Sequence, residues 1–455
     1  MLTMKVDVAI IGAGTAGMSA FHAIKAAGKQ VVLIDRGPLG TTCARVGCMP
    51  SKAALHAGMR WLTAKDLPAG ATLSAQGPQA LWAHARQTRD MLAGGAAERT
   101  RKAAGDGLIM AEARFIAPGI LEVGTQRIEA DAFVVATGSS PMVPRALDDV
   151  ASRILTTDTL FELDTLPKRL GILGLGAIGL ELGLALSRLD VQVVAADQRH
   201  TIGGIQDPDI QERAISRFLD ELPMWLGSPV EVSLVGEEVL MRTSEHSAVV
   251  DRLLVVTGRT PNTAGLNLAA AGVPLDASGR PNIDPFTMRA SDAPIFFAGD
   301  VQPDRPLLHE AADEGQMAAQ GALASLSKEP WRPASRRVPL SILFTDPDVC
   351  SVGLSYDAAM QQGAVIGVAE GGGNGRSKIL GAQENLLRIY VAADTGALLG
   401  ANMLLTHGEH LAHLLAWAIQ AKQTVSELLT MPYYHPSIEE MLQSALKSAA
   451  QQLES

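Results

Sequence analysis

One short pattern occurs twice in this chain and constrains its fold more than any other feature. Each copy runs from an apolar stretch through a Gly-x-Gly-x-x-Gly turn into an Ala- or Leu-rich stretch, then a second apolar stretch and an aspartate. The glycines are Gly12, Gly14 and Gly17 in the first copy and Gly174, Gly176 and Gly179 in the second, and the aspartates Asp35 and Asp197 each lie 23 residues beyond the first glycine. A strand, turn, helix and second strand in this order form a parallel βαβ unit. The repeat therefore predicts an α/β chain with two Rossmann-like domains.

Each part of the repeated pattern has a physical role in binding a dinucleotide. The first glycine permits a tight turn, the second lets the backbone approach a pyrophosphate, and the third packs the helix closely on the strand. The N-terminus of the helix offers free N–H groups to phosphate oxygens. The aspartate at the end of the second strand can accept hydrogen bonds from a ribose. Two copies with the same spacing predict dinucleotide binding at both sites.

Composition excludes several other classes of protein. The 455 residues suggest roughly three domains, and the net charge is −10, with 38 Lys and Arg against 48 Asp and Glu. An acidic chain without a basic cluster is a poor partner for nucleic acid or an anionic membrane. Three cysteines argue against a disulfide-stapled secreted scaffold. The sequence contains no uninterrupted apolar run of about 18 residues, so we expect no transmembrane helix. We expect a cytoplasmic protein.

Two of the three cysteines, Cys43 and Cys48, are five residues apart directly after the first repeat. On a regular helix this separation corresponds to about 7.5 Å along the axis, which is too far for a disulfide. A distorted turn, made easier by Gly47, would bring them together, and a strained bond of this kind is readily reduced. The alternative is two buried free cysteines. The spacing is not typical of zinc ligands, and we expect no metal site.

The segment Thr41-Thr42-Cys43-Ala44-Arg45-Val46-Gly47-Cys48-Met49-Pro50-Ser51-Lys52 resembles the GTCxxxGCxPSK motif of the class I pyridine nucleotide–disulfide oxidoreductases. The resemblance extends over essentially the whole chain and is greatest to dihydrolipoamide dehydrogenase. It implies a two-domain FAD and NAD core followed by a C-terminal α+β dimerisation domain. It also implies that Cys43 exchanges disulfides with substrate and that Cys48 forms the thiolate–flavin charge-transfer pair. Lys52 would lie near the flavin, paired with Glu181.

Further motifs carry the same resemblance. Those for FAD are Ala136-Thr137-Gly138, Phe297-Ala298-Gly299-Asp300 and Leu307-Leu308-His309-Glu310-Ala311, and Thr257-Gly258-Arg259 would close the nicotinamide-binding unit. The implied cofactor-binding residues are therefore Gly12, Gly14, Gly17, Asp35, Lys52, Ala113, Thr137, Gly138, Asp300 and Leu308 for FAD, and Gly174, Gly176, Ile178, Gly179, Asp197 and Gly258 for the pyridine nucleotide. The implied domains are residues 1–145 for FAD, 146–262 for NAD(P), 263–335 for a return to the FAD and central domain, and 336–455 for dimerisation.

The segment His435-Pro436-Ser437-Ile438-Glu439-Glu440 resembles the family's HPTxxE motif. There the histidine handles thiol protons and the glutamate orients it, which places these roles on His435 and Glu440. A thiol attacks as its thiolate, and imidazole exchanges protons near pH 7. In the family this dyad serves the redox disulfide of the other subunit, so the resemblance implies a homodimer with a shared active site.

The chain departs from relatives in ways that leave its substrate open. It ends without the C-terminal cysteine pair of mercuric reductase or large thioredoxin reductase. Ser51 and Ala177 differ from the residues that glutathione reductase has at these positions. We therefore expect a dihydrolipoyl dehydrogenase, whose substrate is a lipoyl group, free or on a lipoyl carrier domain. Arg45 places a cation near the thiols, which leaves an NAD(P)H-dependent reductase of another small, carboxylated disulfide as an alternative. A low-turnover FAD/NAD redox sensor is a second one.

The choice of coenzyme rests on the second aspartate. A carboxylate at Asp197 repels a 2′-phosphate and so favours NAD over NADP. Arg199 and His200 follow closely in the sequence and would weaken that preference. We expect NAD, with NADP as the less favoured coenzyme.

Overall fold

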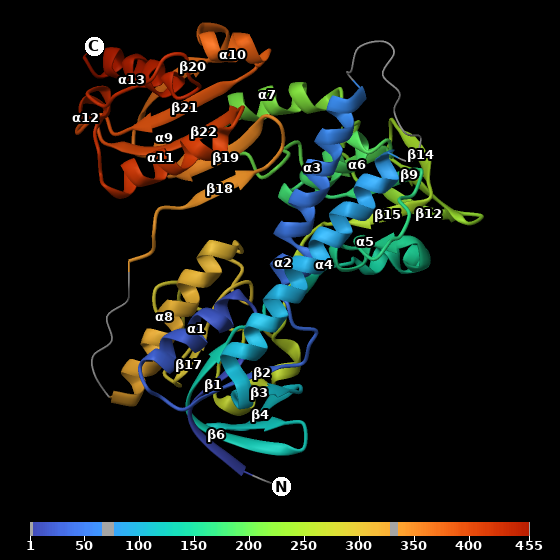
Figure 1. Ribbon diagram of the computed structural model, residues 1–455, viewed down its shortest axis with the longest axis vertical. Helices are drawn as coiled ribbons and strands as arrows, with labels where there is room; N and C mark the ends of the chain where they lie inside the picture. Colours follow the sequence, from blue (N-terminus) through green and yellow to red (C-terminus); the bar gives the residue numbers. More distant parts are fainter. Residues whose placement is uncertain (1–2, 66–76, 328–334, 455) are drawn as a thin grey trace. The chain divides into compact units, whose positions relative to one another are not determined.

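The computed structural model describes residues 3–65, 77–327 and 335–454, and the chain divides into two compact units (Figure 1). The first unit contains Met1–Pro50, Arg86–Met142 and Gly258–Arg336, and the second contains Ser51–Ala85, Val143–Thr257 and Arg337–Ser455. Helices α3 (Cys48–Lys65) and α4 (Gly77–Ala104) each run from one unit into the other.

The first unit is built on a mostly parallel sheet. Its elements are β1 (Thr3–Ile11), α1 (Thr15–Ala26), β2 (Val31–Asp35), α2 (Thr42–Val46), η1 (Gly105–Gly107), β3 (Leu108–Met110), β4 (Ala113–Ala117), β5 (Ile120–Val123), β6 (Gln126–Val135), β7 (Ser139–Pro141), β16 (Arg259–Pro261), η3 (Ala264–Leu266), η4 (Leu268–Ala271), β17 (Ile295–Phe297) and α8 (Leu308–Ser327). Strands β3, β2, β1 and β6 pair in parallel, in that order. The second half of β6 pairs in parallel with β17, and its first half continues into the antiparallel strands β5 and β4.

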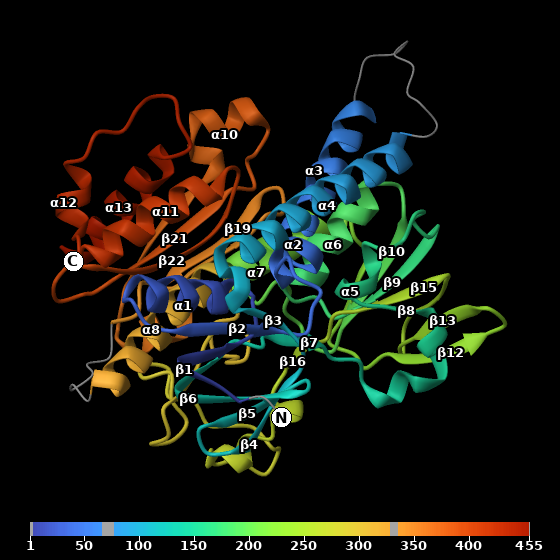
Figure 2. The same ribbon diagram turned by 60° about the horizontal axis from the view of Figure 1, so that its bottom comes forward.

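Apolar residues fill both faces of this sheet, as expected for parallel strands covered on two sides. Ile10 and Leu33 are fully buried in one core cluster, and Ile34 and Val135 in another. Helices α1 and α8 pack together on one side (Figures 1 and 2). Their contact is so close that a Cβ on Gly315 would lie 2.2 Å from the carbonyl oxygen of Ala16.

The second unit joins a second parallel sheet to an antiparallel one. Its elements are η2 (Arg145–Arg153), β8 (Ile154–Leu155), α5 (Thr157–Leu160), β9 (Arg169–Leu173), α6 (Ala177–Arg188), β10 (Gln192–Asp197), α7 (Pro208–Leu219), β11 (Met224–Leu226), β12 (Glu231–Val235), β13 (Glu238–Arg242), β14 (Ser247–Val250), β15 (Arg252–Val255), β18 (Leu340–Leu343), β19 (Asp348–Gly353), α9 (Tyr356–Gln361), β20 (Val365–Glu370), η5 (Gly371–Gly373), α10 (Gly375–Leu380), β21 (Leu386–Val391), β22 (Leu398–Leu405), α11 (Gly408–Gln420), α12 (Val425–Leu429) and α13 (Glu440–Leu453). The parallel sheet has the order β11-β10-β9-β15-β8, β12 to β14 form a three-stranded antiparallel sheet, and the C-terminal sheet has the order β18-β19-β22-β21-β20.

The predicted fold class is confirmed: two Rossmann-like α/β folds are followed by an α+β domain. The third cysteine belongs to the core of that last domain. Cys350 lies in β19, is fully buried, and burial raises the pKa of its thiol. Cys350 is therefore a packing residue of this core. The predicted domain boundaries at residues 145, 262 and 335 stay a proposal.

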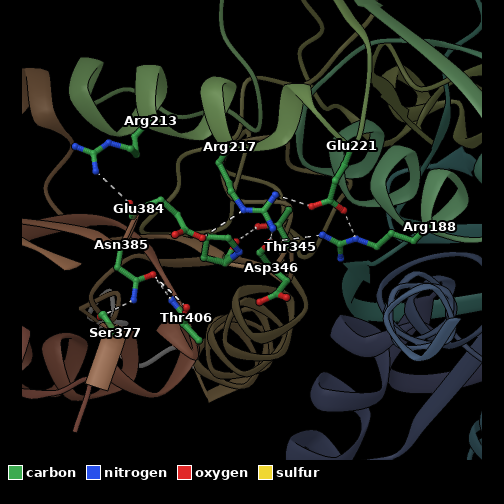
Figure 3. Close-up of polar contacts among 11 residues, drawn as sticks. Arg188, Arg213, Arg217, Glu221, Thr345, Asp346, Ser377, Glu384, Asn385 and Thr406 are labelled. Carbon is green, nitrogen blue, oxygen red and sulfur yellow. Dashed lines mark hydrogen bonds and ion pairs between the residues drawn. The ribbon is translucent and has the colours of Figure 1, made fainter. Parts of the chain in front are cut away.

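A polar network ties α6 and α7 to the C-terminal sheet inside the second unit (Figure 3). The buried guanidinium of Arg188 donates to Glu221 over 2.7 Å, and Arg217 binds the same carboxylate over 2.6 Å. Both arginines also donate to the carbonyl oxygen of Asp346, and Arg217 lies 3.4 Å from Glu384. Burial acts to raise the pKa of Glu221, but the two guanidinium groups outweigh it and hold the pKa below its usual value.

We predict that Arg188→Met lowers the free energy of unfolding by about 3 kcal/mol. The substitution removes one of the two cations that pair with Glu221 and leaves this mostly buried carboxylate with Arg217 alone. Arg213→Met is the matched control, since Arg213 lies 3.7 Å from Glu370 in a more exposed pair and otherwise donates to the carbonyl oxygen of Glu384 over 3.4 Å. Its expected loss is about 0.5 kcal/mol or less. Urea unfolding followed by circular dichroism measures both. Equal losses in the two variants would contradict the account.

Candidate functional site

The first glycine turn has the backbone geometry that a pyrophosphate requires. A Cβ on Gly12, whose φ is +105°, would lie 2.2 Å from the carbonyl oxygen of Ala136, and one on Gly17 would lie 1.9 Å from that of Gly12. Gly14 instead borders open space and is the N-cap residue of α1, with no side chain capping the helix. The first amides of α1 are therefore approachable by phosphate oxygens. These residues fit the diphosphate of a dinucleotide such as FAD.

The second turn repeats this geometry inside the second unit. A Cβ on Gly174, whose φ is +99°, would lie 2.6 Å from the carbonyl oxygen of Val256, and one on Gly179 would lie 1.9 Å from that of Gly174. Gly176 borders open space and is the N-cap residue of α6. Ile178 is half-buried in the first turn of that helix. This turn therefore fits the diphosphate of a second dinucleotide.

The two aspartates also occupy equivalent places. Asp35 ends β2 and accepts hydrogen bonds from the backbone N–H of Ala13 at 2.7 Å and of Gly37 at 2.6 Å. Asp197 ends β10 and accepts the corresponding bond from Leu175 at 2.8 Å. Each carboxylate is therefore fixed beside its own glycine turn, where a nucleotide ribose is expected.

Three of the other predicted FAD residues lie at the carboxyl ends of neighbouring parallel strands. Thr137 and Gly138 follow β6, and Asp300 follows β17, which pairs with β6. The carboxylate of Asp300 accepts a hydrogen bond from Ser139 at 3.3 Å, and the Thr137 hydroxyl donates to the carbonyl oxygen of Asn262 at 2.8 Å. Because Gly12 follows the adjacent strand β1, these residues share one edge of the sheet with the first glycine turn.

The remaining predicted contacts are more dispersed. Ala113 is the first residue of β4, which follows the strand paired with β2. Leu308 is the first residue of α8 and is exposed. Gly258 was predicted for the pyridine nucleotide, but it begins the last segment of the first unit, where its carbonyl oxygen accepts a hydrogen bond from Met142. The cofactor contacts of all three stay predictions.

The segment that carries the two cysteines folds as one short helix, a break at Gly47 and the start of a long helix. Helix α2 carries Cys43 and ends at Val46, and α3 begins at Cys48. A Cβ on Gly47 would lie 3.1 Å from the Cα of Cys43, so a side chain there would crowd the first cysteine. The expected distorted turn is thus present. Both cysteines are free thiols in this structure, Cys48 exposed and Cys43 half-buried, which rules out the alternative of two buried cysteines.

The two thiols are in hydrogen-bond contact, and this decides where a proton stays. The contact with Cys48, burial, and the charge on Cys48 together raise the pKa of the Cys43 thiol well above its usual value. The N–H groups of Cys48 and Met49 act in the opposite direction by donating to the Cys43 sulfur. In the reduced pair, these surroundings therefore favour the protonated form of Cys43.

Lys52 and Glu181 form a compact ion pair in the second unit. The ammonium group of Lys52 lies 2.8 Å from both oxygens of Glu181, whose residue is only 4% exposed. Glu181 also accepts bonds from the Ser51 hydroxyl at 3.3 Å and the Phe344 N–H at 3.0 Å. The Lys52 ammonium lies 4.9 Å from the centre of the Phe344 ring. The carboxylate is thus well compensated, and the lysine is held in one place.

His435 and Glu440 form a dyad at the start of α13. The His435 Nδ1 atom lies 3.0 and 3.2 Å from the two carboxylate oxygens, and the N–H of Ser437 donates to Glu440 at 2.9 Å. The Ser437 N–H and the imidazole lower the pKa of Glu440. The His435 side chain is 77% exposed, and its Nε2 atom has no hydrogen-bond partner among the residues that the structure describes. An oriented ring with a free Nε2 is suited to exchange protons with an incoming group.

Sequence reasoning missed the part played by Phe344. Its backbone N–H binds Glu181 and its ring lies beside Lys52, yet it is 163 residues from Glu181 in the chain. A backbone N–H carries no side-chain signal, so no motif pointed to this residue.

The described residues contain neither a cluster of metal ligands nor a membrane-spanning helix. Across residues 3–65, 77–327 and 335–454, no group of three or more His, Cys, Asp or Glu side chains is placed to hold a metal ion. In the same part of the chain, no helix is both long enough and apolar enough to cross a membrane.

Comparison with known proteins identifies the family. The model described as pyridine nucleotide-disulphide oxidoreductase matches residues 6–316, and the one described as its dimerisation domain matches residues 339–446. The chain is 32% identical over 368 residues to a mercuric reductase of Lysinibacillus sphaericus, covering 78% of this chain and 66% of that protein. It thus spans about two thirds of the length of that relative. It is 30% identical over 464 residues to a dihydrolipoyl dehydrogenase of Thermus scotoductus, covering 98% of each.

Solved structures share the fold along the whole chain. The Cu(II) complex of the HOCl-induced flavoprotein disulfide reductase RclA from Escherichia coli matches with a TM-score of 0.84 at 22% identity, over 98% of this chain and 99% of that one. LpdA from Mycobacterium tuberculosis also matches with a TM-score of 0.84, at 24% identity over 98% of this chain and 99% of that one. The glycine turns, the cysteine pair and the matched domains together place this chain in the pyridine nucleotide–disulfide oxidoreductase family of flavoproteins.

Proposed function

We propose that this protein is an FAD-dependent dihydrolipoyl dehydrogenase, which oxidises a dihydrolipoyl dithiol with NAD⁺. The contact between Cys43 and Cys48 at the start of α3 carries the proposal, because a pair of adjacent thiols can exchange one disulfide for another. The full-length alignment with a dihydrolipoyl dehydrogenase supports this substrate. The dithiol would be free or attached to a lipoyl carrier domain, and a reducing cytoplasm suits a chain with three cysteines.

The proposed reaction begins with Cys43 and Cys48 joined as a disulfide. His435 of the partner subunit takes the proton of one substrate thiol, and the resulting thiolate attacks the sulfur of Cys43. The bond between the cysteines breaks, and Cys48 leaves as a thiolate. The second substrate thiol then displaces Cys43, which releases the cyclic disulfide and leaves both cysteines reduced. Bound FAD supplies the two-electron carrier to NAD⁺, so the net products are lipoyl disulfide, NADH and one proton.

A base is needed because the surroundings of Cys43 raise the pKa of its thiol. Substrate exchange at Cys43 therefore requires a group that moves protons. The His435–Glu440 dyad has an oriented ring for this purpose. Its exposure supports a role at a site completed by a second copy, in keeping with the dimerisation domain. We assign the protein as a homodimer on this basis.

Lys52 and Glu181 are proposed as a charged pair beside the flavin. Lys52 lies four residues beyond Cys48 on α3, about one helical turn away. Glu181 holds the ammonium group through two bonds of 2.8 Å. In this scheme Glu181 is a positioning residue, and Lys52 is the group that faces the cofactor.

A second candidate is an NAD(P)H-dependent reductase of a small anionic disulfide, and Arg45 favours it. The arginine lies two residues beyond Cys43, half-buried, with its stem close to Gly40. Its guanidinium has no hydrogen bond or ion pair with any residue that the structure describes. An unpaired cation two residues from Cys43 in the chain attracts a carboxylate on the substrate.

Dihydrolipoate and dihydrolipoamide separate the two candidates, because they differ only in a carboxylate against a neutral amide. If Arg45 contacts substrate, Arg45→Asn should lower kcat/KM for dihydrolipoate about tenfold, the value of one charge-assisted contact, and leave that for dihydrolipoamide within about twofold. An unchanged ratio would remove Arg45 from substrate recognition.

The proposed function is tested by steady-state assay in both directions. Purified protein reconstituted with FAD should reduce NAD⁺ with dihydrolipoamide at a kcat/KM of about 10⁴ M⁻¹s⁻¹ or more. Mercuric ion and glutathione disulfide, each with NADH or NADPH, serve as competing substrates. If either supports much faster turnover than lipoamide does, the dihydrolipoyl assignment is wrong.

A further inference from the structure

The two glycine repeats hold their aspartates with the same pair of backbone bonds. In the first, Asp35 accepts from the N–H that follows the first glycine and from the N–H of Gly37, two residues beyond the acid. In the second, Asp197 accepts from Leu175 at 2.8 Å and from the N–H of Arg199 at 2.9 Å. The backbone arrangement is therefore duplicated along with the sequence pattern.

The repeats differ in the side chain two residues beyond the acid. Gly37 has none, whereas the guanidinium of Arg199 turns back onto Asp197. Its Nε atom lies 3.1 Å from one carboxylate oxygen and its Nη2 atom 3.0 Å from the other. A forked contact of this type fixes the arginine and neutralises the carboxylate.

The exposure of the two partners shows which one an incoming group would meet. Asp197 is 8% exposed, while the Arg199 side chain is 62% exposed. Burial acts to raise the pKa of Asp197, but Arg199 and the two N–H groups lower it overall, so the acid stays ionised beneath the guanidinium. The surface at the end of β10 therefore presents a cation over a buried anion.

His200, the other basic residue here, is placed differently. A Cβ on Gly227 would fall 2.0 Å from the Cε1 atom of His200, so the imidazole covers that glycine. Only Arg199 of the two contacts Asp197. Of these two basic residues, Arg199 is thus the one that acts on Asp197.

We infer that Arg199 is a specificity-determining residue that lets the second dinucleotide site accept the 2′-phosphate of NADP(H) as well as the free ribose of NAD(H). A bare aspartate repels a 2′-phosphate, whereas an arginine beside the ribose accommodates it. Here Asp197 and Arg199 both lie at the end of β10, and Arg199 is the more exposed of the two. This inference rests on the proposed pyridine-nucleotide site and refines its choice of coenzyme, so that NADP(H) binds within about tenfold of NAD(H).

Binding of adenosine nucleotides tests this without turnover. Isothermal titration of the FAD-reconstituted protein with 2′,5′-ADP and with 5′-AMP compares ligands that differ only by the 2′-phosphate. Arg199→Gln should weaken 2′,5′-ADP at least tenfold, the size of one charge-assisted hydrogen bond, and change 5′-AMP less than about threefold. Arg199→Lys should retain part of the affinity for 2′,5′-ADP.

Arg242→Gln is the matched control, because it removes an exposed positive charge from β13 of the same unit. It should leave both affinities unchanged. If 5′-AMP binds but Arg199→Gln does not alter 2′,5′-ADP, the inference is overturned while the coenzyme site stands. If neither nucleotide binds the unaltered protein, the coenzyme site is wrong and the inference falls with it.

Discussion

Replacing Cys43 with serine should abolish dihydrolipoamide-dependent reduction of NAD⁺, a loss of at least about 10³-fold. A hydroxyl cannot form the disulfide with Cys48 or be attacked by a substrate thiolate, so no exchange takes place. Direct oxidation of NADH by ferricyanide needs no thiol and should stay within about threefold of the unaltered protein. The two assays, run on the same preparation, measure the loss.

Cys48→Ser is the matched control, because it removes the other half of the same pair. If Cys43 is the exchanging thiol, the Cys48→Ser protein should form a stable mixed disulfide with a thionitrobenzoate group at Cys43. The Cys43→Ser protein should form much less, even though Cys48 is the more exposed residue. Mass spectrometry identifies the adduct. Adduct formation mainly at Cys48 would reverse the two assignments.

Replacing His435 with glutamine should lower kcat for dihydrolipoamide oxidation by about 10²- to 10⁴-fold, the range that a positioned general base contributes. The side chain is exposed and bonds only to Glu440 among the described residues, so folding should be unaffected. Loss of the proton acceptor slows formation of the substrate thiolate while nucleotide binding is unchanged. Stopped-flow measurement of cysteine reduction isolates this step.

His413→Gln controls for the loss of an imidazole, since His413 is an exposed residue of α11 whose ring bonds to the carbonyl oxygen of Glu409 and lies edge-on to Trp417. It should have no effect beyond about twofold. Glu440→Gln should give an intermediate loss, because the glutamate orients the ring and does not itself take the proton. A His435→Gln protein with unaltered kcat would eliminate the dyad from the mechanism.

The parts of this molecule that sequence predicts well are those set by local geometry. Gly12 and Gly174 must be glycines because a Cβ would collide with a backbone carbonyl within the same fold, and that requirement is visible as a motif. The break at Gly47 follows from the spacing of the cysteines. The His435–Glu440 contact joins residues only five apart.

Features that depend on distant parts of the chain could not be predicted in this way. Glu181 accepts a hydrogen bond from the backbone N–H of Phe344, a residue of the C-terminal dimerisation domain. The sequence placed Arg199 near Asp197 without revealing the forked contact that masks the carboxylate. Such contacts depend on rotamers and packing, for which a single sequence carries no pattern.

Counting reactive thiols tests whether Cys43 and Cys48 are a redox pair that a pyridine nucleotide reduces. FAD-reconstituted protein is treated with NADH without oxygen and titrated with a chromogenic disulfide, beside an untreated sample. Because Cys350 is fully buried, the account predicts two additional reactive thiols after NADH, and none in the Cys43→Ser protein. Equal counts with and without NADH would contradict it.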